Sequence, residues 1–298
     1  MNETFFFTII IPHYNIPKLL QRCLDSIPDN EDIQVIVVDN NSSPEKVDFE
    51  HFPGLERKYT QVIFDKEGRG AGHARNIALP FVKSKWVLFS DSDDFMQQGF
   101  YQELLKYKDS DADIVVFKAN SVDSETLIPT RRDEALNLNI DRCLKGEVST
   151  TYVAMNHGAP WCKLISTELI RKHNIVFQEV MRANDVLFST KIACFAKKIL
   201  VSTVAIYTIT SRPGSLAFSA QTDFMNLSDR VDVFIGRNQF LKKNGFKPSS
   251  LIPNILAARK ISIKSAFIIA FRLMKSGTFF DGLEEYLRKF LINRIYHR

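Results

Sequence analysis

The stretch Trp86-Val87-Leu88-Phe89-Ser90-Asp91-Ser92-Asp93-Asp94 joins a short apolar run directly to a cluster of carboxylates. Four apolar residues bounded by polar ones are typical of a buried strand. The same change occurs where Phe5–Ile11 leads into Pro12-His13-Tyr14-Asn15, and where Ile33–Val38 leads into Asp39-Asn40-Asn41-Ser42. Three strands that each end in a polar loop predict one sheet edge that carries the functional groups.

Helical stretches separate these strands. Apolar residues recur with helical spacing in Pro17–Ile27, between the first two strands. The expected elements continue with strand 61–64, helix 71–82, strand 86–89, helix 99–106 and strand 113–117. This alternation predicts an α/β fold with a Rossmann-like, mostly parallel sheet covered by helices on both faces. Residues from about 120 to 150 are polar and weakly periodic, and the pattern gives them no firm assignment.

The composition excludes several classes of protein. A chain of 298 residues with 45% apolar content is neither disordered nor collagen-like. No apolar run approaches the ~18–20 residues that a membrane-spanning helix needs. The first strand lacks the basic segment and cleavage site of a signal peptide, so we expect a cytoplasmic location. Four cysteines without a Cys-x-x-Cys pair argue against a zinc ribbon and a disulfide framework.

The positive charge is concentrated near the C-terminus. Residues 226–298 hold 14 Lys and Arg against 5 Asp and Glu, and their pattern predicts helices over 226–244 and 254–275. One side of the second helix carries Lys260, Lys264, Arg272 and Lys275. This basic extension either packs on the rest of the chain or on another subunit, or it lies on an anionic inner membrane surface. Nucleic acid is not an expected partner, because no known binding motif accompanies the charge.

The carboxylates after the third strand point to a cation. Asp91, Asp93 and Asp94 would hold like charges close together, which is unfavourable unless a cation lies among them. A few oxygen ligands suit Mn²⁺ or Mg²⁺ shared with a phosphate. An EF-hand is excluded, since the sixth position from Asp91 is Met96 and the twelfth is Gln102. A solvated acidic turn remains the alternative.

A glycine-rich loop, Gly68-Arg69-Gly70-Ala71-Gly72, precedes the expected helix that carries Arg75 and Asn76. Glycines between a strand and a helix can let the backbone approach a diphosphate. The loop matches neither the dinucleotide-binding fingerprint nor the P-loop. It is therefore either a ligand-binding turn or a flexible loop that caps a helix.

Four of these segments together resemble glycosyltransferase family 2. They are Ile9–Asn15, Val37–Ser42, Ala74–Asn76 and Phe89–Asp94, in the order and approximate spacing of that family. A second block is similar to the acceptor-side segments of bacterial surface-polysaccharide, capsule and lipopolysaccharide transferases: Ala159–Leu164, Asn184–Phe188 and Arg212–Leu216. The resemblance implies a GT-A catalytic domain over 1–225, with a nucleotide half at about 1–118 and an acceptor half at about 150–218, followed by a helical extension over 226–298.

The resemblance also implies roles on the donor side. Pro12 and Tyr14 would lie against the nucleobase, with Asn15 also in the nucleotide-sugar site. Asp39 would accept the N3–H of uracil, which favours a UDP-sugar. Arg75 would lie near the base or the diphosphate. Ribose or sugar hydroxyls would contact Asp91 and Ser92, and Asp93 and Asp94 would hold the metal.

On the acceptor side, Asp185 matches the catalytic base of the family. An Asp before Val186-Leu187-Phe188 could equally cap a helix. The chain departs from the family pattern at two positions, with Asn184 in place of the usual Glu and Asn40 in place of the usual Asp. The candidate contacts to the acceptor are Trp161, Lys163 and Arg212, although Trp161 equally suits the core.

The expected function is metal-dependent, inverting transfer of a hexose or N-acetylhexosamine from a UDP-sugar. The acceptor would be a hydroxyl of a glycan or of a lipid-linked oligosaccharide in bacterial surface-polysaccharide synthesis, with the enzyme in the cytoplasm or peripheral to the inner face of the membrane. A glycosidase is disfavoured, because it needs two carboxyl groups about 5 or 6.5–9.5 Å apart and no metal. A nucleotidyltransferase and a non-catalytic sugar-nucleotide or glycan-binding subunit remain open alternatives.

Overall fold

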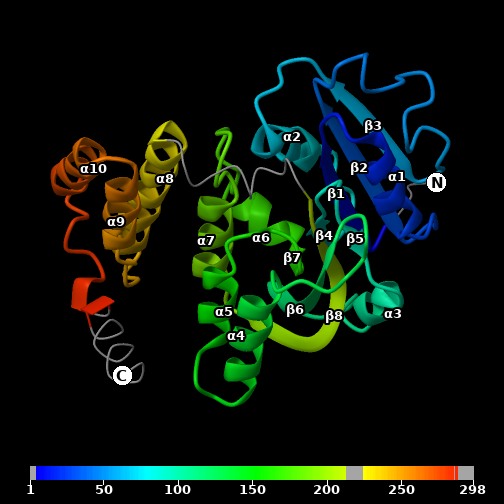
Figure 1. Cartoon of the computed structure of the whole chain (residues 1–298). Helices are drawn as coiled ribbons and strands as arrows, with labels where there is room; N and C mark the ends of the chain where they lie inside the picture. The colour runs from blue at the N-terminus through cyan, green and yellow to red at the C-terminus, as the bar shows by residue number, and fades with distance from the viewer. Residues whose placement is uncertain (1–4, 213–223, 285, 288–298) are drawn as a thin grey trace. The chain divides into compact units, whose positions relative to one another are not determined.

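The computed structural model describes residues 5–212, 224–284 and 286–287 (Figure 1). The chain divides into two compact units, Met1–Arg212 and Pro213–Arg298. The strands of the first unit are β1 (Phe7–His13), β2 (Ile33–Asn40), β3 (Thr60–Asp65), β4 (Trp86–Phe89), β5 (Phe95–Met96), β6 (Ile114–Asp123), β7 (Lys163–Ser166) and β8 (Ile199–Ser211). Its helices are α1 (Pro17–Asp25), α2 (Ala71–Ala78), η1 (Leu79–Phe81), α3 (Phe100–Leu105), α4 (Glu134–Leu144), α5 (Thr150–Asn156), α6 (Thr167–Lys172) and α7 (Val186–Phe195).

The strands form one sheet in the order β3-β2-β1-β4-β7-β6-β8-β5. Strand β1 pairs in parallel with β2 and β4, β2 pairs in parallel with β3, and β6 pairs in parallel with β8. Strand β7 runs antiparallel to both β4 and β6, and the short β5 runs antiparallel to β8. The predicted α/β fold with a mostly parallel sheet is therefore confirmed, and β7 joins its two parallel parts.

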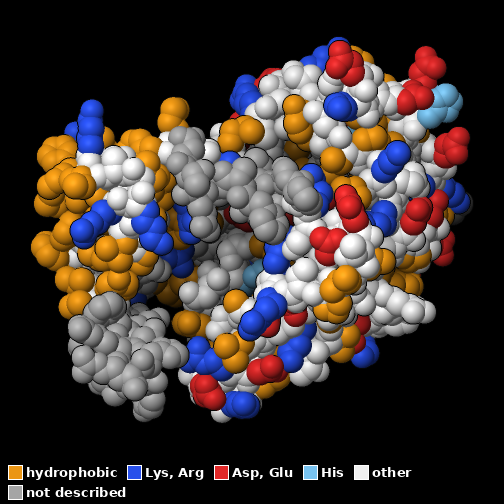
Figure 2. Space-filling view, in the orientation of Figure 1, with side chains coloured by type: hydrophobic (Ala, Val, Ile, Leu, Met, Phe, Trp, Pro, Cys, Tyr) orange, Lys and Arg blue, Asp and Glu red, His pale blue; other side chains and the backbone are white. Residues whose placement is uncertain are grey.

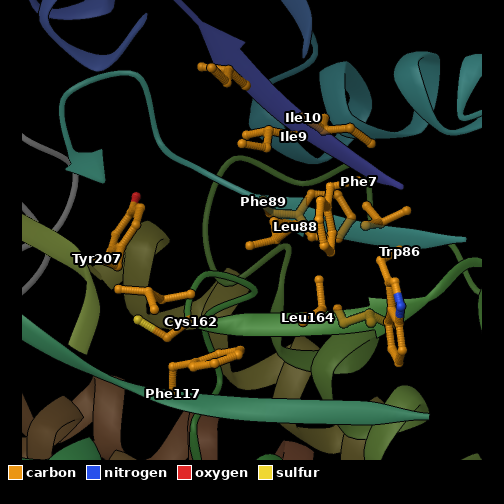
Figure 3. Packing of buried hydrophobic residues seen from close by; sticks show 14 of the residues in the cluster. Phe7, Ile9, Ile10, Trp86, Leu88, Phe89, Phe117, Cys162, Leu164 and Tyr207 are labelled. Carbon is orange, nitrogen blue, oxygen red and sulfur yellow. The ribbon is translucent and has the colours of Figure 1, made fainter. Parts of the chain in front are cut away.

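The core lies on both faces of this sheet. Every residue of β1 and β2 is buried, as expected for parallel strands covered on both sides. Figure 3 shows apolar side chains of neighbouring strands packed together, from Ile10 of β1 through Phe89 of β4 and Leu164 of β7 to Phe117 of β6. This packing fixes the strand ends from which the polar loops leave.

Helix α2 lies close to the sheet because its sequence is rich in small residues. It buries Gly72, Ala74 and Ala78, and it carries Arg75 into the interior with them. The predicted helix over 71–82 is shorter than expected, since a 3₁₀ turn at Leu79–Phe81 follows α2. Pro80 has no N–H to continue the α-helical ladder, which accounts for the early end.

The region around residues 120–150 contains regular structure that the sequence pattern did not reveal. Strand β6 runs to Asp123 rather than ending near residue 117, with a break in its register between Val116 and Lys118. Helix α4 follows and buries Leu136 and Ile140. The end of β6 and helix α4 thus lie in the polar stretch, about residues 120–150, to which the sequence pattern gave no firm assignment.

The second unit contains α8 (Phe224–Lys243), α9 (Ile252–Ile261) and α10 (Ile263–Lys275). The prediction of one helix over 254–275 is wrong, because Ser262 has an extended backbone that ends α9. The Ser262 hydroxyl then caps α10 by accepting the N–H of Ser265 at 3.0 Å. Lys260 and Lys264 therefore lie on different helices. Among the described residues, no helix is long and apolar enough to cross a bilayer.

Candidate active site

The site is built at the sheet edge where β1, β2 and β4 end. His13, the last residue of β1, is the parallel partner of Asp39 on β2, and Ile10 is the partner of Phe89 at the end of β4. The loops after these strands therefore leave the sheet at the same edge. This placement agrees with the expectation that their polar residues gather there.

Asp39 is held in a fixed orientation beneath this edge. Its carboxylate is 1% exposed and accepts hydrogen bonds from His13 Nδ1 at 2.7 Å and from the Ser42 amide at 3.0 Å. His13 Nε2 accepts a hydrogen bond from the Ile16 N–H. The proton of the imidazole is therefore on Nδ1, which donates the hydrogen bond to Asp39. Burial raises the pKa of Asp39, but the bonds from His13 and Ser42 outweigh it and hold the pKa below its usual value. The site thus holds Asp39 ionised and oriented.

The other residues of the first loop differ in exposure. Pro12 is buried in β1, whereas the Tyr14 side chain is 57% exposed. Asn15 joins the first two loops, since its side-chain oxygen accepts the Ser43 N–H at 2.8 Å and its own N–H reaches Ser42 Oγ at 2.8 Å. Tyr14 is therefore the ring in this segment that is available to a ligand.

Arg75 links the carboxylate loop to the segment before α7. Its guanidinium donates to Asp91 Oδ1 at 2.5 Å and to Asn184 Oδ1 at 3.1 Å. The Arg75 side chain is 4% exposed and lies 5.2 Å from the centre of the Phe177 ring. A buried guanidinium with two acceptors and an aromatic neighbour is a rigid bridge. It fixes Asp91 and Asn184 relative to each other.

Asn184 and Asn40, the two positions where the chain departs from the family pattern, have different surroundings. Asn184 supplies an amide oxygen to Arg75 and donates to the Val180 carbonyl, so it serves as the acceptor that a carboxylate would also provide. Asn40 is 7% exposed, and its Oδ1 has no hydrogen-bond partner among the described residues. A buried acceptor without a partner is costly, so Asn40 is a further candidate for contact with a ligand.

The loop after β4 is anchored to β8 by Tyr207. The Tyr207 hydroxyl accepts the Asp91 N–H at 2.9 Å and donates to Asp94 Oδ2 at 2.8 Å. Asp94 Oδ1 accepts the Thr210 N–H at 2.7 Å, and the Asp94 side chain is buried. Both Asp94 oxygens therefore bond within the protein. Figure 3 shows the Tyr207 hydroxyl directed away from Cys162 and Phe117.

Asp93 and Asp94, the two predicted metal ligands, differ in burial and in bonding. Burial and the Asp91 charge raise the pKa of Asp93, and its Oδ2 accepts from Arg212 Nε at 2.9 Å. Burial and the charges of Asp93 and Asp91 raise the pKa of Asp94 well above its usual value. Ser92, between Asp91 and Asp93, is buried. Of the two predicted ligands, Asp93 is the more exposed carboxylate, and Asp94 is the one bonded into β8.

This donor set fits a shared cation rather than a closed cage. Within residues 5–212, 224–284 and 286–287, no group of three or more His, Cys, Asp or Glu side chains is arranged to hold a metal. Mg²⁺ and Mn²⁺ are commonly held by one or two carboxylates together with substrate phosphates and water. Asp93, with Asp91 beside it, has the oxygen chemistry for such a site.

Asp185 lies at the start of α7 but does not cap it. It occupies the N-cap position, and its side chain makes no capping hydrogen bond. Burial raises the pKa of Asp185, while the nearby positive charges of Arg75 and Lys163 lower it and the Asp91 charge raises it. A carboxylate with a raised pKa that the helix does not use has the properties of a proton acceptor.

The predicted acceptor residues occupy different depths. Trp161 is part-buried and stacks on Tyr207 with ring centres 5.6 Å apart. Lys163 is fully buried, and its ammonium donates to the His157 carbonyl and, at 3.0 Å, to the Ala159 carbonyl. Burial lowers the pKa of Lys163 to about 7. Lys163 therefore supports the loop that carries Trp161 rather than presenting its ammonium to an acceptor. Of the Arg212–Leu216 segment, residues 213–216 lie outside the described residues.

Gly72 is required where α2 meets the segment before α7. A Cβ atom at Gly72 would lie 2.3 Å from the Gln178 carbonyl oxygen and 2.9 Å from the Asn184 Cβ. Gly72→Ala should therefore destabilise the fold by about 1–3 kcal/mol and shift Asn184 and Asp185. Gly236→Ala in α8 is the matched control, because nothing lies within 4 Å and alanine favours a helix. Thermal unfolding should show a loss for Gly72→Ala alone, and equal midpoints would refute the close contact.

Two bacterial glycosyltransferases are similar to this chain in sequence. The chain is 27% identical over 207 residues to the poly(ribitol-phosphate) beta-glucosyltransferase of Bacillus spizizenii. It is 26% identical over 241 residues to TarS, the poly(ribitol-phosphate) beta-N-acetylglucosaminyltransferase of Staphylococcus aureus. The matches cover 65% and 77% of this chain but 30% and 40% of those relatives. This chain thus spans less than half the length of either relative.

Solved structures confirm the GT-A fold. The crystal structure of TarS residues 1–349 with UDP-GlcNAc matches with a TM-score of 0.63 at 19% identity, covering 95% of this chain and 80% of that one. The mannosyltransferase PcManGT of Pyrobaculum calidifontis, with GDP-Man and Mn²⁺, matches with a TM-score of 0.54 at 18% identity, covering 91% of this chain and 80% of that one. Both alignments extend beyond the sheet into the helical second unit.

The family is shown by a direct match to its sequence profile. The profile of Glycosyl transferase family 2 covers residues 8–173, which is more than half of the chain. That range contains the β1, β2 and β4 loops, Arg75 and the segment around Trp161. The chain belongs to glycosyl transferase family 2.

Proposed function

We propose that this chain transfers a hexose or N-acetylhexosamine from a UDP-sugar to a hydroxyl of a cell-surface polymer, with inversion at the anomeric carbon. The Asp91–Arg75–Asn184 bridge carries the proposal, because it holds the segment of Asp185 beside the carboxylate loop. The bridge thus links a donor-binding loop to a base. A non-catalytic binding subunit would have no need of that arrangement.

The donor side of the proposal assigns the nucleobase to the β1 and β2 loops. Asp39, ionised and fixed by His13, would accept the N3–H of uracil, and Tyr14 would lie against the ring. Asp91 and Ser92 would contact the ribose or the sugar, and Asp93 would hold Mn²⁺ or Mg²⁺. Such a cation, when bound, neutralises charge on the leaving diphosphate. TarS, which has been crystallised with UDP-GlcNAc, supports the choice of donor.

In the reaction, the acceptor hydroxyl attacks the anomeric carbon while Asp185 takes the hydroxyl proton. The bond from that carbon to the diphosphate breaks, and UDP leaves with the electron pair. Attack and departure on opposite faces invert the configuration. Trp161 and Arg212 would line the acceptor path. Poly(ribitol-phosphate), the polymer in the names of both relatives, leads us to propose a teichoic-acid-type acceptor rather than lipopolysaccharide.

A comparison of UDP with CDP tests the nucleotide assignment. The two bases differ at the proton that Asp39 would accept, and a hydrogen bond to a charged group is worth about 1.5–3 kcal/mol. We expect UDP to bind about tenfold or more tightly than CDP, and Asp39→Ala to remove most of that preference. Ser42→Ala, which keeps the carboxylate, should retain the preference. Thermal stabilisation with Mn²⁺ present measures both affinities, and equal affinities in the unmodified chain would reject the assignment.

Turnover distinguishes the remaining alternatives. Release of UDP from UDP-glucose or UDP-GlcNAc in the presence of poly(ribitol-phosphate) would support sugar transfer. Pyrophosphate release from a nucleoside triphosphate would instead indicate a nucleotidyltransferase. UDP binding without turnover of any donor would favour a binding subunit.

A further inference from the structure

Helix α10 carries an apolar stripe on its exposed side. Ile263, Phe267, Phe271 and Met274 are 70%, 72%, 64% and 55% exposed. Their spacing of four, four and three residues places them on one face of the helix. Figure 2 shows hydrophobic side chains gathered over α9 and α10, with basic side chains among them. An exposed apolar face with two phenylalanines is typical of an interaction surface.

The second unit does not need this stripe for its own core. The opposite face of α10 buries Ser265, Ile269 and Leu273. Ile269 and Leu273 belong to a cluster with Val231 of α8 and Ala258 of α9. The three helices therefore close a core around one side of α10. The stripe remains on the other side.

The charge around the stripe selects the kind of partner. Residues 252–275 contain five cations and no Asp or Glu. Arg272 turns inward to Ser228 and Asp232. Lys264 and Lys275 are exposed beside the stripe, and no ion pair between described residues engages either of them. Apolar side chains flanked by unpaired lysines match a bilayer surface that contains anionic lipid.

We propose that α10 docks the chain on an anionic lipid surface. Phe267 and Phe271 insert at the boundary of the acyl chains, and Lys264 and Lys275 lie among the headgroups. A second copy of this chain is a poorer partner, because two facing stripes would bring their exposed lysines together. The stripe belongs to the second unit and no residue of the proposed transfer reaction is part of it, so the proposal does not depend on the donor or the acceptor.

Vesicle flotation of the full chain tests the proposal. We expect binding to vesicles of equal parts phosphatidylglycerol and phosphatidylcholine, weaker binding to phosphatidylcholine alone, and release at high salt. Phe267→Ser combined with Phe271→Ser should lower binding by about tenfold or more, because two apolar rings leave the interface. Lys264→Gln combined with Lys275→Gln should lower binding only to the anionic vesicles, by about 25-fold, at roughly fivefold per lysine.

The control is Ile128→Ser, which changes a side chain of the first unit that is 63% exposed and should leave binding intact. Unchanged thermal midpoints for the α10 variants would show that the stripe is exposed in the free protein. Three results would overturn the proposal. They are a lack of binding to anionic vesicles, a large drop in the midpoint of the phenylalanine variant, and a dimer in solution that this variant abolishes.

Discussion

Asp185→Asn should lower the rate of sugar transfer by about 10²–10⁴-fold while UDP binding stays unchanged. Asn cannot take a proton from the acceptor hydroxyl, but it has nearly the same shape as Asp. The substitution should not destabilise α7, since the Asp185 side chain makes no capping hydrogen bond. The rate should be measured as UDP release, and binding as stabilisation by UDP with Mn²⁺.

The pH dependence provides a second test of the same role. A base works only when it is deprotonated, and burial raises the pKa of Asp185. Transfer should therefore fall as the pH drops through that raised pKa and level off above it. Asp185→Asn should abolish this limb of the profile. Near-normal turnover of the Asn variant, or an unchanged acid limb, would remove Asp185 as the base.

Asn184→Ala separates the base from its support. It removes the acceptor for Arg75 but keeps the carboxylate of Asp185. We take Asn184 as a positioning residue. Asn184→Ala should therefore reduce turnover less than Asp185→Asn does, and the rate should still fall at low pH as it does in the unmodified chain.

The strand-end loops could be predicted because their signal is local. Each of β1, β2 and β4 passes from buried apolar residues to polar ones within one or two positions, and parallel pairing brings these ends together. Family resemblance then gave Asp39, Arg75 and Asp91 their proposed roles. The register of β1 and β2 also pairs His13 with Asp39, and the sequence pattern alone does not reveal this hydrogen bond.

Residues that support the site from distant positions in the sequence could not be predicted, because no local change from apolar to polar residues marks them. Tyr207 bonds to Asp91 and Asp94 across more than a hundred residues of sequence. Nothing in the pattern of β8 marks this hydroxyl, because a buried Tyr in a strand is ordinary. The break at Ser262 was missed for a different reason. The Ser262 hydroxyl caps α10, and apolar periodicity does not report such a contact.

Asp93→Ala should abolish the part of UDP binding that depends on a divalent cation. Asp93 is the more exposed of the two predicted ligands, whereas Asp94 bonds to Tyr207 and Thr210 through both of its oxygens. Loss of one carboxylate from a site with few protein donors should cost about a hundredfold in apparent UDP affinity with Mn²⁺ present. Binding in EDTA should be nearly the same for the variant and the unmodified chain.

Arg212→Ala is the matched control for Asp93→Ala, since both substitutions remove the ion pair between Asp93 Oδ2 and Arg212 Nε. Only Asp93→Ala removes the carboxylate. If Asp93 is a metal ligand, Arg212→Ala should keep a strong Mn²⁺ effect on UDP binding, because loss of the guanidinium leaves both Asp93 oxygens to the cation. Equal loss in the two variants would show that the ion pair orders the loop. Full Mn²⁺ dependence in Asp93→Ala would show that the cation lies elsewhere.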